Sequence, residues 1–276
     1  MLRSGNDAAI QIAETIGGSK EGFAELMNQK AKELGLVSTH FVTPHGLDET
    51  EHYTTAYELA CLTDYALNNA KFAEIVNSKT HTIRINNIPR ELFNTNELLG
   101  NLYGVDGVKT GFTNGAGRCL VTSTTREENQ IITVVLGADT KKIRTKDSAT
   151  LIEYAFSNFE RIKIKQKIIE EFEKWQKTEQ SHITIPKGKQ EEPELILGDI
   201  PYDMYPIRKD KIKDINIKIK TINEVKPPVD KNQILGILEV KQGEETLFSV
   251  NVLAKQDVKK KGIADYYLQI LRAFPI

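Results

Sequence analysis

Two short motifs carry polar side chains that could take part in chemistry, and one of them suits an anionic ligand. The first is Lys109-Thr110-Gly111, which opens a run whose pattern predicts a β-strand. The lysine supplies a positive charge, the threonine supplies a hydroxyl, and the glycine lets a bound peptide approach the strand closely. A three-residue match is common, however, and a solvated strand end explains this one on its own.

The second motif is Ser4-Gly5-Asn6, directly before a predicted helix. Serine or asparagine at such a position is usually an N-cap, whose side chain accepts a hydrogen bond from the first helical turn. Ser4 has no histidine or aspartate partner in an obvious position, so a Ser-His-Asp triad is not supported. By itself, this motif predicts only helix capping.

Length and composition exclude several classes of function. The 276 residues, 39% of them hydrophobic, suffice for one large domain or two smaller ones. A net charge of −1 gives no sign of nucleic-acid binding. Cys61 and Cys119 form no CxxC pair, and the histidines lack HExxH spacing. We therefore expect no metal, no cofactor and no disulfide framework, and we do not favour a zinc site at His40 and His45.

Helical periodicity dominates the first 76 residues. We expect helices over residues 8–16, 19–34, 55–69 and 72–76. Ser19 is the expected N-cap of the second helix, and Gly35 is its left-handed stop. Thr55 and Glu58 form the expected capping box of the third helix.

Strand patterns follow. A strand over 80–85 ends at an Asn86-Asn87 turn, and the chain is then irregular up to Gly107. Three further strands joined by tight turns predict an antiparallel meander; they span residues 108–112, 117–124 and 130–137. The last expected element of this half is a helix over 148–159, and its buried stripe comprises Leu151, Ile152, Ala155 and Phe156.

Composition changes beyond about residue 163, where lysine, isoleucine, proline and glutamate dominate. Short alternating strands predict a small β-sandwich; they span residues 183–185, 215–219, 234–240 and 247–253. Three lysines then precede an apolar helical face formed by Ile263, Tyr267, Ile270, Leu271 and Phe274. Such a helix suits a membrane interface, and docking onto its own domain is the alternative.

In this order and context, the two motifs resemble those of serine penicillin-recognising enzymes. The residues around them resemble one family, the low-molecular-mass penicillin-binding proteins, which are serine D-alanyl-D-alanine carboxypeptidases (peptidase family S11). The segments that carry the resemblance are 4–9, 44–48, 52–56, 107–113 and 116–117. The resemblance, which runs through about residue 255, implies an α+β fold. A partial β-lactamase/penicillin-binding-protein-like domain of helices and antiparallel sheet (1–162) precedes a β-rich domain (163–258) and an amphipathic tail (259–276).

The resemblance also implies an activity and roles for particular residues. The family removes the terminal D-alanine from a peptidoglycan pentapeptide through a serine acyl-enzyme. Ser4 matches the serine that passes a proton toward the leaving amine, and Asn6 matches the asparagine that holds the substrate amide. Lys109 and Thr110 match residues that bind the substrate carboxylate and tune the serine network. Among these, Ser4, Asn6 and Lys109 are the expected catalytic residues.

Substrate binding is expected of Thr110, Gly111, Phe112 and Arg144. Gly111 permits close approach, and the Phe112 N–H matches one arm of an oxyanion hole. Arg144 matches an arginine near the carboxylate site; the alternative is a surface arginine that caps the next helical region. The implied partners are the D-Ala-D-Ala stem peptide, β-lactam antibiotics in the full-length form, and a membrane surface for the tail. The implied location is the outer face of the bacterial cytoplasmic membrane.

One element of the family's pattern is missing. The family's nucleophile lies in a Ser-x-x-Lys upstream of the serine motif, and no serine of this chain has a lysine three positions later. No signal peptide precedes Met1 either, so the sequence taken literally predicts a cytosolic protein. We expect an N-terminally truncated chain that is inactive as written, and we favour an incomplete gene model or a frameshift. The alternatives are a non-catalytic relative that binds peptidoglycan or a partner, and a β-lactamase, against which the second domain, the tail and loop 44–48 argue.

Overall fold

A computed structural model describes residues 1–178 and 183–273 of the chain. Its internal contacts divide the protein into two compact units, Met1–Ser157 and Asn158–Ile276. Each unit has its own hydrophobic core, so each is described by itself below.

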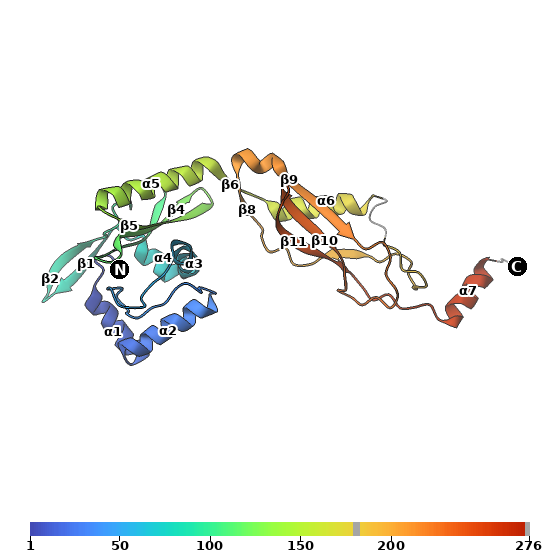
Figure 1. Cartoon of the computed structure of the whole chain (residues 1–276), viewed down its shortest axis with the longest axis horizontal. Coiled ribbons are helices and arrows are strands. Elements are labelled where there is room, and N and C mark those ends of the chain that lie inside the picture. Colours follow the sequence, from blue (N-terminus) through green and yellow to red (C-terminus); the bar gives the residue numbers. More distant parts are fainter. Residues whose placement is uncertain (179–182, 274–276) are drawn as a thin grey trace. The chain divides into compact units, whose positions relative to one another are not determined.

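Unit 1 opens with four helices, which Figure 1 shows in blue and blue-green. They are α1 (Asn6–Gly17), α2 (Lys20–Glu33), α3 (Ala56–Leu67) and α4 (Ala70–Val76). Two predicted helix ends are confirmed, because the Ser19 Oγ accepts a hydrogen bond from the Gly22 N–H at 2.9 Å and Gly35 follows α2 at φ +72°. The predicted capping box is only half present. Thr55 caps α3 by accepting from the Glu58 N–H, but the Glu58 carboxylate turns away to the loop that precedes Thr55.

A β-hairpin follows the helices. Strands β1 (Thr80–Ile85) and β2 (Ile88–Phe93) pair antiparallel around Asn86 and Asn87, which both adopt positive φ. The turn was predicted; the irregular chain expected after it was wrong over residues 88–93, which form β2, and is confirmed over residues 94–104. Pro89 interrupts the strand pattern of β2, although a proline is tolerated in a strand whose N–H has no ladder partner.

The predicted meander is confirmed as a three-stranded antiparallel sheet in the order β3-β4-β5. Its strands are β3 (Val105–Thr113), β4 (Gly117–Arg126) and β5 (Asn129–Ala138). In the register of β3 with β4, Lys109 lies opposite Val121 and Thr110 lies opposite Leu120. Side chains alternate along a strand, so Lys109 and Thr110 belong to opposite faces of the sheet. Among the described strands, β3 pairs only with β4, which leaves the edge that carries Gly111 open.

Helix α5 (Lys141–Asn158) covers one face of this sheet (Figure 1). It begins at residue 141, whereas the sequence predicted a start at 148. Its fully buried positions are Arg144, Ser148 and Ile152, spaced four residues apart, while Leu151 of the predicted stripe is 42% exposed. Two polar residues in the buried stripe hid the first half of the helix from a search for apolar periodicity. Ile152 packs with Leu120 and with the apolar residues Leu98, Leu99 and Val105.

Unit 2 contains a four-stranded sheet in the order β7-β11-β10-β9. Its strands are β7 (Leu195–Leu197), β9 (Ile215–Thr221), β10 (Ile234–Gln242) and β11 (Glu245–Ala254). The last three confirm predicted strands, whereas the strand expected over 183–185 is reduced to one bridge between Thr184 and Glu224. A separate pair joins β6 (Phe159–Ile162) to β8 (Tyr205–Arg208), and a 3-10 helix, η2 (Lys209–Asp214), follows it. The sequence boundary after residue 162 placed β6 in the first domain, yet β6 pairs within unit 2.

The β-rich unit also contains a helix that the sequence did not predict. Helix α6 (Ile164–Gln176) buries Ile164, Ile168 and Phe172 in the core of unit 2. Lysine and glutamate occupy most positions between these three residues, which made the apolar stripe sparse.

The last element that the structure describes is α7 (Ile263–Ala273), within the predicted tail. Four of the five residues of its predicted apolar face are exposed, from Leu271 at 47% to Ile263 at 91%; the fifth, Phe274, lies outside the described residues. Among the helices that the structure describes, none combines the length and hydrophobicity needed to cross a membrane.

Candidate active site

A pocket of about 480 Å³ lies in unit 1 beside the edge of β3. All seven residues that the sequence nominated line it: Ser4, Asn6, Lys109, Thr110, Gly111, Phe112 and Arg144. Six further residues that it did not nominate complete the wall: His45, Gly46, Leu47, Thr95, Arg118 and Lys141. The fold therefore joins four distant segments at one place: the start of α1, a loop before α3, strands β3 and β4 with the turn before β3, and the start of α5.

The serine motif is not a helix cap in this structure. Gly5 is the N-cap of α1 and no side chain caps the helix, while Ser4 adopts the left-handed conformation at φ +55°. Such a conformation costs a non-glycine residue roughly 1 kcal/mol. The backbone just before Ser4 is fixed to the rest of unit 1, because the Leu2 side chain is buried and the Leu2 carbonyl accepts the Thr95 N–H at 3.3 Å. Neither the Ser4 nor the Asn6 side chain has a hydrogen-bond partner within the described part of the chain, so both polar groups are available to a ligand.

Lys109 brings an uncompensated positive charge to the pocket. Burial lowers the pKa of its ammonium from the usual 10.5. The ammonium donates to the Thr110 carbonyl at 2.6 Å, and none of the ion pairs between described residues includes it. A half-buried cation that has only a neutral acceptor is stabilised by an anionic ligand.

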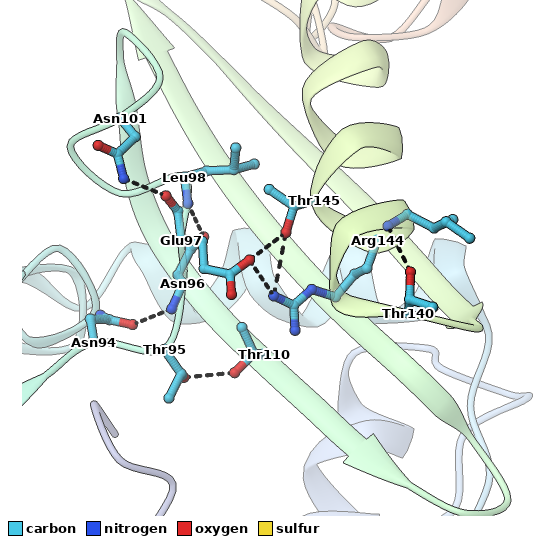
Figure 2. Close-up of polar contacts among 11 residues, drawn as sticks. Asn94, Thr95, Asn96, Glu97, Leu98, Asn101, Thr110, Thr140, Arg144 and Thr145 are labelled. Atoms are coloured by element: carbon cyan, nitrogen blue, oxygen red, sulfur yellow. Dashed lines mark hydrogen bonds and ion pairs between the residues drawn. The ribbon is translucent and has the colours of Figure 1, made fainter.

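The second cation of the wall, Arg144, projects from the first turns of α5. The residue is 3% exposed, which contradicts its interpretation as a surface arginine. Its Nη2 lies 3.3 Å from the Glu97 carboxylate, and its Nε is buried without a partner among the described residues (Figure 2). On the same side of the sheet, the Thr110 hydroxyl lies 2.7 Å from the Thr95 hydroxyl. The sequence could not indicate Thr95 or Glu97, because both lie in an irregular segment without periodicity.

Another wall comes from the loop that carries His45, Gly46 and Leu47. Asp48 ties this loop to the turn after β3 by accepting the Gly115 N–H at 3.0 Å. A hydrogen bond from Thr113 is the main cause that lowers the pKa of the Asp48 carboxyl, and the Gly115 N–H adds to it.

His52 binds the backbone of the first part of the same loop. Its Nδ1 accepts the backbone N–H groups of Val42 at 3.1 Å and Thr43 at 3.3 Å, which requires that this nitrogen carry no proton. Burial is the main cause that lowers the pKa of His52; nearby His40 and His45 lower it further, whereas Asp48 and Glu49 oppose the shift.

Together these groups suit the binding of an extended peptide that ends in a carboxylate. An open strand edge offers backbone hydrogen bonds, Gly111 leaves room beside it, and Lys109 and Arg144 supply positive charge. A hydroxyl nucleophile needs an adjacent base, and Ser4 has no such partner among the described residues. The groups that line the pocket are therefore suited to binding and polarising such a peptide.

Comparison with known proteins agrees with this geometry. Residues 1–140 match the peptidase S11 family, described as D-alanyl-D-alanine carboxypeptidase, and residues 176–260 match the C-terminal domain of penicillin-binding protein 5. The D-alanyl-D-alanine carboxypeptidase DacF of Bacillus subtilis is 34% identical over 266 residues, which cover 96% of this chain and 66% of DacF. DacA of Haemophilus influenzae is 32% identical over 274 residues, which cover 94% of this chain and 63% of DacA. The chain thus spans about two thirds of the length of these curated relatives.

Solved structures show the same likeness. Penicillin-binding protein 5 from Haemophilus influenzae superposes with a TM-score of 0.73 at 29% identity, covering 93% of this chain and 72% of that one. The carboxypeptidase DacD from Francisella tularensis gives a TM-score of 0.71 at 26% identity, covering 94% of this chain and 73% of that one. Because the S11 match covers just over half of the 276 residues and a penicillin-binding protein 5 C-terminal domain follows it, the chain belongs to the D-alanyl-D-alanine carboxypeptidase family of penicillin-binding proteins.

Proposed function

We propose that the pocket of unit 1 binds the D-alanyl-D-alanine end of a peptidoglycan stem peptide, with the terminal carboxylate against Lys109 and Arg144. The observation that carries this proposal is the pairing of two incompletely compensated cations with an open strand edge in one pocket. Ser4 and Asn6, whose side chains have no partner among the described residues, line the same pocket and would meet the peptide amide. Membership of the carboxypeptidase family supports the same substrate.

We further propose that these 276 residues bind this peptide without cleaving it. The acyl-enzyme reaction of the family needs a serine activated by a nearby base, and no Ser-x-x-Lys occurs in the sequence. Binding groups that remain after a nucleophile is lost cannot replace covalent catalysis. Ser4 then serves as a polar wall of the pocket, and it would relay a proton only in a polypeptide that also contained the serine and lysine.

The test is equilibrium binding of an acetylated peptide that ends in D-Ala-D-Ala, measured by isothermal titration calorimetry. The free-acid peptide should bind at least tenfold more tightly than its C-terminal amide, because the amide lacks the charge that Lys109 and Arg144 meet. Lys109→Met should abolish this preference, whereas Lys146→Met, an exposed lysine on α5 outside the pocket, should preserve it. Equal affinity for acid and amide would contradict the assignment of the pocket.

Mass spectrometry tests the absence of acylation. The intact chain incubated with benzylpenicillin should keep its mass, and the D-Ala-D-Ala peptide should release no D-alanine. A stable, saturable penicillin adduct would refute the proposal that the chain alone is non-catalytic.

We also propose that α7 lies in a membrane interface. Ile263, Tyr267 and Ile270 are between 59% and 91% exposed, so they do not pack against unit 2, and a lysine run precedes the helix. The full chain should float with vesicles that contain anionic lipid, and replacing Ile263 and Ile270 by glutamate should prevent this. Equal flotation of the double variant and the parent would contradict the proposal.

A further inference from the structure

The turn over residues 94–98, which lies between β2 and β3, has a backbone fixed by its own side chains. The Asn94 Oδ1 accepts the Asn96 N–H at 2.9 Å, and the Asn96 Oδ1 accepts the Leu98 N–H at 3.1 Å. The Asn94 amide group donates to the Val76 and Ser78 carbonyls, which ties the turn to the end of α4. Leu98 is buried in the core of unit 1. The 94–98 turn is therefore held from both ends, which limits where its middle residues can point.

Three successive side chains of this turn reach three different parts of the pocket region, as Figure 2 shows for the outer two. The Thr95 hydroxyl lies 2.7 Å from the hydroxyl of Thr110. The Asn96 amide, 3% exposed as a residue, donates to the Gly107 carbonyl of β3 at 2.8 Å. The Glu97 carboxylate accepts from Arg144 at 3.3 Å and from the Thr145 hydroxyl at 2.8 Å. The turn thus connects the Thr110 strand to the Arg144 helix.

The two partners of the Glu97–Arg144 ion pair differ strongly in burial, and this difference affects how Arg144 can meet a ligand. The guanidinium is almost fully buried, whereas the Glu97 side chain is 50% exposed. A distance of 3.3 Å exceeds the roughly 2.7–2.9 Å of a strong charge-assisted hydrogen bond. Glu97 engages only the Nη2, and the Nε has no partner within the described residues. Glu97 therefore orients the guanidinium through Nη2 and leaves Nη1, which bonds to no described residue, to a ligand, whereas the unpartnered Nε is itself sealed from solvent.

From this geometry we propose that Glu97 is a positioning residue of the pocket. It holds the Arg144 guanidinium, through Nη2 and with the help of Thr145, in the direction in which the ligand carboxylate meets it. This role requires only an acceptor oxygen at Glu97. The negative charge of its carboxylate is not needed, because that charge also repels an anionic ligand at the site. The proposal rests on the function proposed above in taking a carboxylate as the ligand group.

The experiment uses the full chain with Glu97→Ala and Glu97→Gln, and Glu91→Ala on the exposed face of β2 as the matched control. Glu97→Ala should lower the affinity for the free-acid D-Ala-D-Ala peptide about five- to tenfold and leave the already weak affinity for the amidated peptide unchanged. Glu97→Gln keeps the acceptor oxygen, so it should bind the free acid within about twofold of the parent or more tightly. Glu91→Ala should match the parent for both peptides.

A merely structural role predicts a different pattern. If Glu97→Ala lowered the affinity for both peptides equally together with the melting temperature, or if Glu97→Gln were as weak as Glu97→Ala, the positioning role would be overturned. Unchanged affinity of Glu97→Ala for the free acid would overturn it as well.

A second readout separates this proposal from the function on which it rests. If the parent chain bound neither peptide, the proposed function would fail, and nitrogen-detected NMR of the arginine side chains would still decide the role of Glu97. A held guanidinium rotates slowly and shows separate Nη–H signals, which Arg144→Lys assigns by their loss. Those signals should persist in Glu97→Gln and merge in Glu97→Ala; separate signals in all variants would overturn the proposal.

Discussion

The buried carboxylate of Glu58 gives the sharpest test of how unit 1 holds its pocket together. Glu58 is 6% exposed, and both of its oxygens accept the Ser38 N–H, at 2.8 and 3.0 Å. One oxygen also accepts the Thr39 hydroxyl at 2.5 Å, and that hydroxyl lies 2.8 Å from the hydroxyl of Thr54. These contacts close the base of the loop that carries His45–Leu47 to the pocket. Glu58→Ala would open that base.

The magnitude follows from the groups that lose their acceptor. Hydrogen bonds to a charged partner contribute about 1.5–3 kcal/mol each, and the substitution removes those of one backbone amide and one hydroxyl. Allowing for entry of water, we expect Glu58→Ala to lower the free energy of unfolding of unit 1 by about 3–5 kcal/mol. This is a large share of the roughly 5–15 kcal/mol that stabilises a typical domain. Glu58→Gln keeps one acceptor oxygen, so it should cost about half as much.

The assay has to resolve the two units, because a chain with two compact units need not unfold in one step. Trp175, the single tryptophan, lies in α6 of unit 2, so its fluorescence reports the unfolding of that unit. Native-state hydrogen exchange of the α3 amides reports unit 1. We expect Glu58→Ala to speed hydrogen exchange of the α3 amides and to leave the urea transition of tryptophan fluorescence unchanged. A loss below about 1 kcal/mol in α3 would refute the role assigned to the carboxylate.

Three further predictions concern the loop, the sheet and unit 2. Burial holds the folded-state pKa of His52 below its ordinary 6.5, so unit 1 should be most stable above pH 6.5 and should lose stability as the pH falls from 6.5 toward that lowered pKa. His52→Asn keeps a hydrogen-bond acceptor but does not titrate, so the melting temperature of this variant should depend less on pH within this window. Gly117→Ala should destabilise unit 1 by about 1–2 kcal/mol, because the residue adopts φ +67° and a Cβ would lie 3.1 Å from the Gly137 Cα. Hydrogen exchange of the α3 amides measures this loss of stability, and unchanged exchange would contradict the prediction. Ile168→Ala should cost about 2–5 kcal/mol in unit 2, because the side chain is fully buried, and should lower the urea midpoint of Trp175 fluorescence while α3 exchange stays unchanged.

The sequence predicted those elements whose residues repeat with a clear period or end at a distinctive residue. The β3-β4-β5 meander alternates strongly, and α2 begins at a serine cap and ends at a glycine with positive φ. Helix α5, which has polar residues on its buried side, was predicted too short. Arg144 and Ser148 face the core from α5, where a polar residue argues against burial unless its partner is known. That partner, Glu97, is 47 residues away in the chain.

In the candidate site, the sequence likewise could not identify every residue that lines the pocket. The seven residues nominated by motif and resemblance do line one pocket, and their individual roles stay predictions. Arg118 and Lys141 add positive charge to the wall, but neither belongs to a motif that the sequence makes visible. Each lies near the end of an element, where exposed basic residues are common and have no special meaning. Only the folded register, which brings the start of β4 and the start of α5 to the same pocket, distinguishes these two from other surface cations.

The core and the pocket of unit 1 depend on different interactions, and this separation has a consequence. Leu120 and Ile152 bury apolar surface between the sheet and α5, and that burial sets the register that places Thr110. The orientation of the pocket groups depends instead on polar contacts, namely Thr95 with Thr110 and Glu97 with Arg144. Each polar contact contributes little to stability beside the apolar core, yet it decides where a donor points. Substitutions in the polar set should therefore change ligand preference more than unfolding, whereas Leu120→Ala should reduce both.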